Sequence, residues 1–182
     1  MSYSFPGDRE IEMIARLQAE NAQLRKKVEK RTRAAFRLAI LCGILFVMIY
    51  TNNRAAYIED HLSAGTLPVK VSFDVKQTEY HSLGEDTVFS YACNGKNIDS
   101  GDTVLTGKKL NPSVTITELD ASQDDTGREA FVFTLPPYTG KTTDSVTVYE
   151  NGGGGHSGSA TWDVVCSYRL KLNPIKVFFY RA

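Results

Sequence analysis

The chain has 182 residues, in which 21 Lys and Arg residues are balanced by 21 Asp and Glu residues. We expect no nucleic-acid partner, because a polybasic stretch beside a membrane is usually a topology signal that also attracts anionic lipid; a specific phosphoinositide or nucleic-acid site is the alternative. The balance conceals an uneven division, because residues 1–37 carry nine Lys and Arg against five Asp and Glu, whereas the remainder carries twelve against sixteen. The length after residue 66 is enough for one hydrophobic core.

A heptad pattern begins shortly after the N-terminus, with Ile14, Asn21 and Val28 at its a positions and Leu17 and Leu24 at its d positions. This stretch, residues 14–28, resembles the zipper half of basic-leucine-zipper proteins, in which Leu recurs at d and one a position is Asn. The resemblance implies a parallel homodimer, because a pair of Asn side chains at a favours two strands in one register. It does not imply DNA binding, because the basic region precedes the zipper in that family and follows it here.

The charges around the zipper fit a dimer, since Glu20 at g can pair with Arg25 at e of a partner helix. Two heptads are marginal alone, because short helices are barely stable in water. The pattern therefore leaves one alternative open, in which a solvated amphipathic helix lies on the inner leaflet of a membrane.

An apolar stretch, AAFRLAILCGILFVMIY, occupies residues 34–50. A bilayer core needs about 20 helical residues, with a lower limit near 17, so the stretch is just long enough if Arg37 extends its guanidinium into the headgroups. Apolar side chains surround this helix on all sides, which argues against a core helix with one polar face. A signal peptide would lie closer to Met1 and end in a small-x-small cleavage site. We therefore predict a retained transmembrane helix, or signal-anchor.

Basic residues crowd the N-terminal side of the apolar stretch, namely Arg25, Lys26, Lys27, Lys30, Arg31, Arg33 and Arg37. Near its other end only Arg54 is basic, and Glu59 and Asp60 oppose it. The positive-inside rule predicts a single-pass cell-membrane protein in which residues 1–33 form a cytoplasmic arm. Residues 51–66 would then form a helical stalk, and residues 67–182 an extracytoplasmic domain. The basic cluster should also attract anionic lipid.

From Pro68 the hydrophobic period changes to two, as Val69, Val71 and Phe73 alternate with polar residues. Asn94-Gly95 is typical of a tight hairpin turn. The other expected strands contain Phe89 to Cys93, Ile98, part of Asp99 to Gly107, Val114 with Ile116, Phe131 to Leu135, Val146 with Val148, Trp162 to Leu172, and Lys176 to Tyr180. About eight strands in roughly 115 residues, with no helical pattern between them, indicate an all-β antiparallel sandwich.

Three cysteines are present, and Cys42 lies inside the apolar stretch. Cys93 and Cys166 each lie on the inward parity of an expected strand, and the outside of a cell is oxidising, so we predict an inter-sheet disulfide between them. Two buried free thiols are the alternative. The cysteine pair loosely resembles that of immunoglobulin domains, although no Trp follows Cys93 at the usual interval and Val164 stands where that family has a Tyr.

One acidic segment, VTITELDASQDDTGREAFVFTL, loosely resembles a strand, an acidic loop and the next strand of C2 domains. The resemblance implies a calcium site, in which Glu118, Asp120, Asp124 and Asp125 supply oxygen ligands. The spacing departs from the C2 pattern by about one residue, and the family's first acidic loop has no clear counterpart. A solvated acidic turn is the alternative.

No catalytic constellation stands out, so we expect neither an enzyme nor a cofactor. His61, His81 and His156 lack metal-ligand spacing, and no G-x-S-x-G or phosphate-loop signature is present. His156-Ser157 lies in a glycine-rich loop, which is a poor place to hold a nucleophile against its base. The expected function is a membrane-anchored binding or adaptor protein. The alternatives are a structural subunit of a larger membrane assembly and, last, an exported enzyme.

Overall fold

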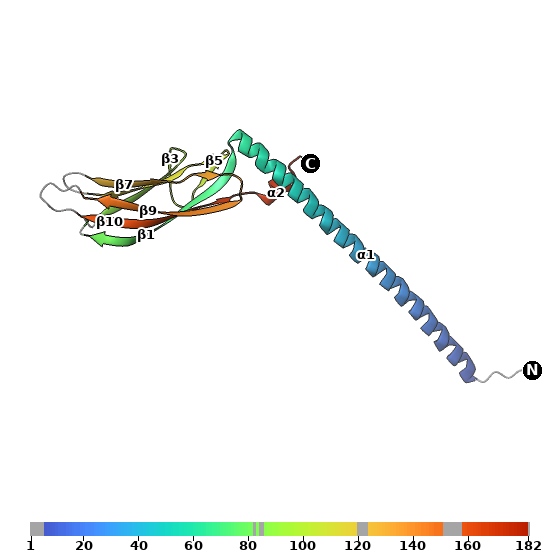
Figure 1. The fold of residues 1–182 in the computed structure, drawn as a ribbon. Helices are drawn as coiled ribbons and strands as arrows, with labels where there is room; N and C mark the ends of the chain where they lie inside the picture. Colours follow the sequence, from blue (N-terminus) through green and yellow to red (C-terminus); the bar gives the residue numbers. More distant parts are fainter. Residues whose placement is uncertain (1–5, 82, 84–85, 120–123, 151–157, 182) are drawn as a thin grey trace, which may run out of the picture. The chain divides into compact units, whose positions relative to one another are not determined.

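The computed structural model describes residues 6–81, 83, 86–119, 124–150 and 158–181 (Figure 1). The chain divides into two compact units, residues 1–52 and residues 53–182. The second unit contains the end of the first helix, all the strands and a short C-terminal helix.

The N-terminal part of the described chain is one helix of 59 residues, α1 (Pro6–Ala64). Its sequence is rich in Ala, Leu, Glu, Lys and Arg, which favour helix, and Pro6 and Pro68 are the nearest prolines on either side of its interior. The helix ends at Ala64 and is followed by Gly65, whose φ of +69° is the left-handed conformation of a C′ glycine. Thr66 N–H then donates to the His61 carbonyl at 2.9 Å and Gly65 N–H to the Leu62 carbonyl at 3.4 Å, as in a Schellman motif. The long apolar N-terminal helix that the sequence predicts is confirmed.

The strands form two four-stranded sheets in which every pairing is antiparallel. The first sheet has the order β4 (Thr103–Thr106), β1 (Leu67–His81), β10 (Ser159–Leu170), β9 (Thr139–Tyr149). The second has the order β3 (Lys96–Ile98), β2 (Thr87–Cys93), β6 (Pro112–Glu118), β7 (Asp125–Ala130). A two-stranded ribbon joins β5 (Lys109–Leu110) to β8 (Phe133–Thr134). A mostly antiparallel β domain is therefore confirmed.

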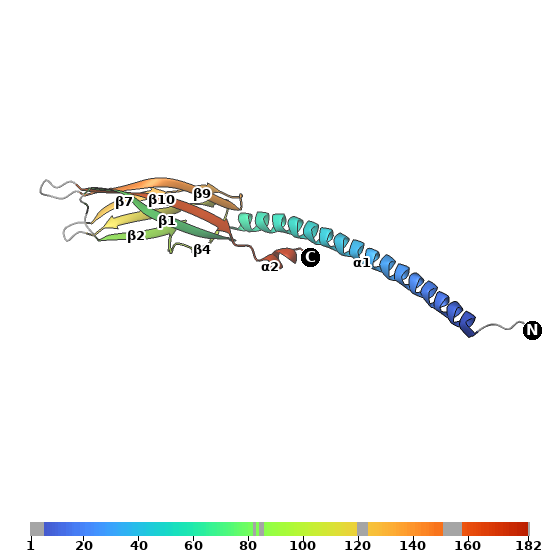
Figure 2. The same cartoon turned by 90° about the horizontal axis from the view of Figure 1, so that it is seen from below.

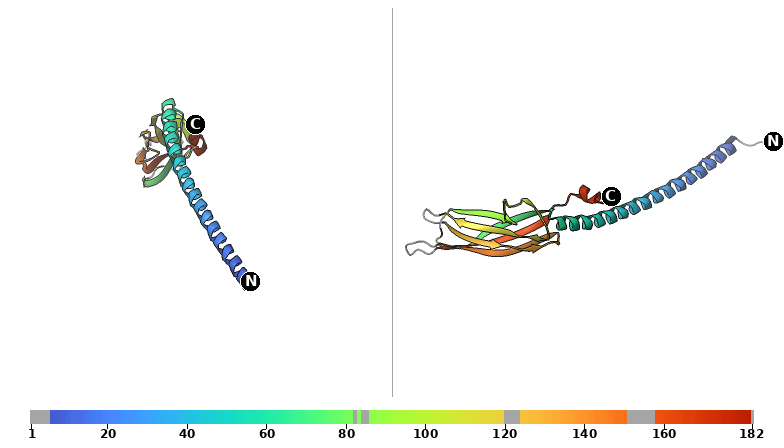
Figure 3. Two further views of the ribbon diagram at one scale, coloured as in Figure 1. Left: turned by 90° about the vertical axis from the view of Figure 1, so that its right-hand side faces the viewer. Right: turned by 90° about the horizontal axis from the view of Figure 1, so that it is seen from above.

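The two sheets pack against each other, and their strands run alongside one another in Figures 2 and 3. Phe73 of β1 stacks on Tyr91 of β2 with ring centroids 4.6 Å apart. Trp162 of β10 meets Phe89 of β2 edge to face at 6.3 Å. The alternating inward residues of the central strands complete this core, with Val69, Val71, Val114, Ile116, Val164, Cys166 and Tyr168 all buried.

Gly127 allows β7 of the second sheet to approach β9 of the first. A Cβ atom added to Gly127 would lie 2.7 Å from the Thr147 carbonyl oxygen and 2.8 Å from Cγ1 of Val146. These distances are shorter than ordinary van der Waals contacts. The absence of a side chain at this position therefore lets the two sheets meet along this side of the domain.

Asn94-Gly95 forms the predicted turn between β2 and β3, with φ values of +50° and +77°. Positive φ at both central residues is what a type I′ hairpin turn requires. The strand expected at Phe131 to Leu135 is confirmed only at Phe133–Thr134, which pairs with β5, whereas the longer strand β7 lies earlier in the chain. Phe131 and Leu135 are nevertheless buried, so their apolar side chains reflect packing and not a ladder.

The strand expected from Lys176 to Tyr180 is wrong, because this segment contains a short helix, α2 (Pro174–Phe178). The Asn173 side-chain oxygen caps it by accepting from the N–H groups of Ile175 at 3.0 Å and Lys176 at 3.2 Å. Pro174 follows at the first helical position, where its missing N–H costs nothing. An N-cap followed by Pro therefore outweighs the β propensity of the apolar residues.

Candidate interaction surfaces

The predicted zipper residues lie on one face of α1, since its helical spacing brings a and d positions together. In the single chain Ile14, Leu17, Leu24 and Val28 are 52–63% exposed, and Asn21 between them is exposed as well. A row of half-exposed apolar side chains with one central Asn is a surface suited to a second helix. The dimer itself stays a prediction.

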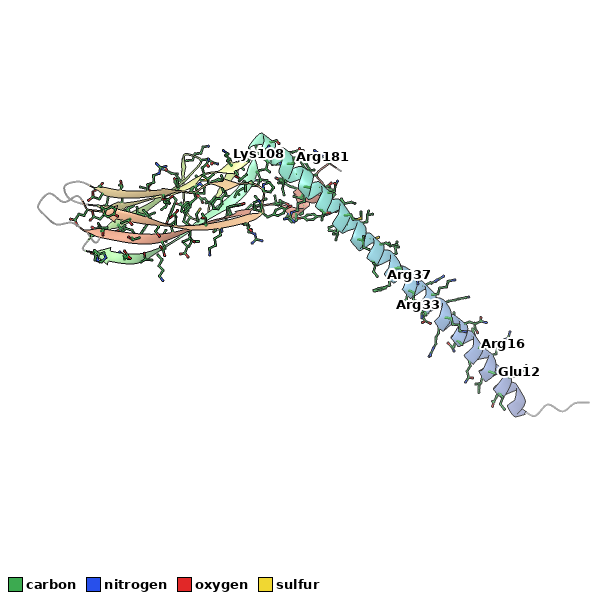
Figure 4. All side chains as sticks on the ribbon, viewed as in Figure 1. Glu12, Arg16, Arg33, Arg37, Lys108 and Arg181 are labelled. Atoms are coloured by element: carbon green, nitrogen blue, oxygen red, sulfur yellow. The ribbon has the colours of Figure 1, made fainter. Side chains whose placement is uncertain are left out.

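A basic face, defined as Lys26, Lys30, Arg33 and Arg37, lines a shallow groove on the same helix. Figure 4 labels Arg33 and Arg37. Glu29 lies in the groove and pairs with Arg33, with 2.5 Å between Nη2 and Oε1. In the heptad these four cations occupy c and f positions, which face away from a and d. A partner helix and an anionic surface could therefore use opposite sides of α1.

The apolar stretch at residues 34–50 lies within the one described helix that is long and apolar enough to cross a membrane. None of its most apolar 18-residue window is buried. The large residues Leu38, Leu41, Leu45 and Met48 are each about 60% exposed. This stretch therefore does not contribute to a protein core within the chain.

Both candidate cysteines of the β domain are buried, Cys93 on β2 of the second sheet and Cys166 on β10 of the first. They are free thiols in this structure. Burial raises the pKa of Cys93 to about 11. Burial raises the pKa of Cys166 to about 12, and the nearby charge of a Cys93 thiolate adds to the rise. The disulfide stays a prediction, for which the structure supplies two inward cysteines on facing sheets.

Two of the four candidate calcium ligands lie opposite each other. Glu118 at the end of β6 pairs in register with Asp125 at the start of β7, and both side chains are buried. Asp124 is exposed beside them, and Asp120 lies outside the described residues. Among the described residues no group of three His, Cys, Asp or Glu side chains could hold a metal ion. The calcium site stays a prediction that depends on the segment between Leu119 and Asp124.

The structure brings together a cluster that the sequence reading missed, here called the C-terminal clamp: Asn53, Tyr57, Asp60 and His61 of α1 with Tyr180 and Arg181. Tyr180 donates from its hydroxyl to Oδ2 of Asp60 at 2.8 Å, and Arg181 donates from Nη2 to the same oxygen at 2.8 Å. The hydrogen bond from Tyr180, followed by that from Arg181, lowers the pKa of the Asp60 carboxyl. The same bond to Asp60 raises the pKa of the Tyr180 hydroxyl.

The aromatic rings of the C-terminal clamp pack closely. Tyr57 stacks on His61 with centroids 3.8 Å apart and meets Tyr180 edge to face at 5.1 Å. Of the three candidate histidines, His61 is thus held in a packing role, His81 ends β1, and His156 lies outside the described residues. The aromatic run FFYRA at the end of the chain was the available signal for this cluster, because such residues rarely remain wholly solvated.

A groove of about 380 Å³ lies between the last turns of α1 and the segment after β8. Its lining is Ala55, Ile58, Glu59, Leu62, Ser63, Lys108, Leu135, Pro136 and Tyr138, and Figure 4 labels Lys108. The Arg54 guanidinium lies 3.9 Å from the centroid of the Tyr138 ring, a cation–π contact. These contacts join the end of α1 to the β domain.

Comparison of the chain with protein-family models, with curated proteins and with solved structures finds no match. A functional proposal therefore depends on the surfaces described above.

Proposed function

We propose that this chain is a single-pass membrane-anchored binding or adaptor protein, with its N-terminus in the cytoplasm and a β-sandwich presented outside. One observation carries the proposal: none of the most apolar window of α1 is buried. Removing a Leu side chain from water contributes about 1.5–3 kcal/mol, so a run of such side chains left in water would be strongly unfavourable. A bilayer supplies the missing apolar environment.

The distribution of charge supports the proposed orientation. The basic face, Lys26, Lys30, Arg33 and Arg37, lies directly before and at the start of residues 34–50. Cytoplasmic flanks of transmembrane helices carry such an excess of Lys and Arg. The anionic lipids of the inner leaflet would attract these side chains, each contributing about 1 kcal/mol.

The exposed zipper face supports a parallel homodimer. Its apolar side chains at 14, 17, 24 and 28 would be covered by the same side chains of a second copy, and the two Asn21 side chains would meet. The basic face points away from this contact, so dimerisation leaves it free for lipid.

The edges of the β domain favour an adaptor over a structural subunit. The edge strands β4 and β3 have only four and three residues. On β9 the stretch Thr139–Ser145 contains only polar residues and Gly. Short or polar edges discourage strand addition, and among the described residues no long apolar edge invites it. A structural subunit of a larger membrane assembly remains the second candidate, tested below by the native oligomeric state.

Two matched substitutions on α1 test anchoring and dimerisation separately. Leu41 and Val28 are each 63% exposed, but only Leu41 lies in the proposed span. Arg at the centre of a span costs about 2.5–3.5 kcal/mol of insertion free energy. Leu41→Arg should therefore release the full chain from membranes into an alkaline carbonate wash, whereas Val28→Arg should stay in the membrane and lose the crosslinked dimer.

Each outcome of this experiment bears on one part of the proposal. Retention of Leu41→Arg in the membrane as firmly as wild type, or release of wild type itself, would contradict anchoring through residues 34–50. Unchanged crosslinking of Val28→Arg would contradict the zipper. Crosslinking of wild type mainly to other proteins, with no homodimer, would favour the structural subunit.

A further inference from the structure

The C-terminal helix carries an apolar pair that the β domain does not cover. Ile175 and Phe179 lie four residues apart, on one side of α2 and its C-cap, and are 69% and 65% exposed. Val177 between them is fully buried and attaches the other side of the helix to the domain. Two large apolar side chains are thus held outward by a segment that is itself anchored.

Hydrogen bonds fix the position of this segment along α1. The buried Asn53 side chain donates from Nδ2 to the Phe178 carbonyl at 2.6 Å. Two turns further along α1, Asp60 accepts from Tyr180 and Arg181 at 2.8 Å each. The backbone next to Phe179 is therefore held beside Asn53 and cannot move away without breaking these contacts.

Asn53 follows the proposed span closely. It comes three residues after Tyr50, which is less than one turn and, at 1.5 Å per residue, about 5 Å of helix. The polar headgroup region on each side of a bilayer is about 5–8 Å thick. A group fixed beside Asn53 therefore lies at headgroup depth when residues 34–50 cross the bilayer.

The chemistry of the segment matches that depth. Aromatic side chains are enriched where hydrocarbon meets water, and Phe179 is such a side chain. Lys176 is exposed beside the apolar pair and can reach a lipid phosphate while its stem stays apolar. A protein partner would need no such fixed distance from the span, whereas a lipid surface does.

We propose that Ile175 and Phe179 insert into the interfacial region of the outer leaflet, so that α2 is a membrane-contacting foot of the extracytoplasmic domain. This inference rests on the proposed span at residues 34–50. The foot gives the domain a second attachment to the bilayer beside α1.

Fluorescence quenching by lipid tests the foot in the full chain reconstituted into phosphatidylcholine vesicles that contain bromine high on the acyl chains. Phe179→Trp places a reporter at the foot, and Tyr149→Trp places a matched control, 66% exposed, at the end of β9. Native Trp162 is buried and gives the same background in both proteins. Brominated lipid should quench the emission of Phe179→Trp at least twofold more than that of Tyr149→Trp.

A second pair of substitutions tests how the foot is held. Asn53→Ala removes the donor to Phe178, whereas Asn52→Ala changes an exposed neighbour. When combined with Phe179→Trp, Asn53→Ala should reduce the quenching by brominated lipid toward that of Tyr149→Trp, whereas Asn52→Ala should leave it unchanged.

The possible failures are distinguishable. Equal quenching of the two reporters in protein that resists carbonate extraction would overturn the foot and leave the membrane anchor intact. Protein that does not remain with the vesicles would overturn both. Protection of Phe179→Trp from lipid and from aqueous iodide alike would show a protein contact, such as a second copy, and would also overturn the foot.

Discussion

The approach of β7 to β9 at Gly127 gives a quantitative prediction. In Gly127→Ala the new methyl group would lie 2.7 Å from the Thr147 carbonyl oxygen, 2.8 Å from Cγ1 of Val146 and 3.1 Å from Cγ2 of Val148. Carbon atoms pack at about 3.5–4.0 Å, so β7 and β9 must separate by roughly 1 Å. Val146 pairs with Trp162 in the register of β9 and β10, so the displacement reaches the core.

The net destabilisation follows from two opposing terms. Overpacking a core costs about 1–3 kcal/mol, and replacing Gly by Ala recovers about 0.4–1 kcal/mol by restricting the unfolded chain. The expected loss is about 1–2 kcal/mol of unfolding free energy, or a fall in Tm of about 3–8 °C for a unit of this size.

Trp162 is the single tryptophan of the chain and is buried in the β domain, so its fluorescence reports this transition without interference from α1. The assay is thermal unfolding of the full chain in detergent. Thr126→Ala is the matched control on the same strand, since Thr126 is exposed and should change the free energy by no more than about 0.5 kcal/mol. An unchanged or higher Tm for Gly127→Ala would refute the close approach of β7 and β9.

Three further predictions concern the zipper, the thiols and the acidic segment. Asn21→Ile should stabilise the coil but weaken its preference for two strands, so crosslinking in membranes should yield higher oligomers; the absence of any dimer in wild type would show that the zipper is only a surface helix. A disulfide between Cys93 and Cys166 should contribute ~4 kcal/mol, so reduction should lower Tm, and the double Ala variant should be no less stable than either single one. In reduced protein the pKa values of Cys93 and Cys166 are raised to about 11 and about 12 from the ordinary 9.0. The stability that the buried neutral thiols contribute is therefore complete below pH 9 and is lost as pH rises through 11–12. Oxidised protein should lack this pH-dependent stability, and a mass measured without reductant that shows both thiols free would contradict the disulfide. If the acidic segment binds calcium, about 1 mM CaCl₂ should raise the Tm of wild type but not that of Asp125→Asn, and an equal Tm with and without calcium would leave a solvated turn.

The elements with a clear period were predictable from sequence. Apolar and polar residues alternate in residues 69–75 and 162–170 because each strand has one face in the core. The structure confirms both strands, as β1 and β10, and pairs them with each other. The Asn94-Gly95 turn was equally predictable from the sequence, because few residues other than Asn and Gly accept positive φ.

The errors in strand prediction arose where a residue is buried by side-chain packing without pairing in a strand, or pairs in a strand without apolar side chains. Phe131 and Leu135 were predicted as strand residues because apolar side chains alternate there, but these two buried residues lie on either side of β8 and outside the strands. The strand β7 itself, DTGREA, has little apolar character, and it is held by pairing with β6 and by the approach of Gly127 to β9. No local pattern encodes such a long-range contact.

The C-terminal clamp escaped prediction for a similar reason. Asp60 and Arg181 are 121 positions apart, and nothing in either local sequence identifies the other as its partner. The opposition of Glu118 and Asp125 could be anticipated only as an acidic segment, because strand register decides which carboxylates face each other.

Protease protection in intact cells tests the proposed orientation most directly. With one epitope tag before Met1 and another after Ala182, external protease should remove the C-terminal tag and leave residues 1–33 with the N-terminal tag intact. Permeabilised cells, as the control, should lose both tags. Loss of the N-terminal tag with protection of the β domain in intact cells would contradict the account.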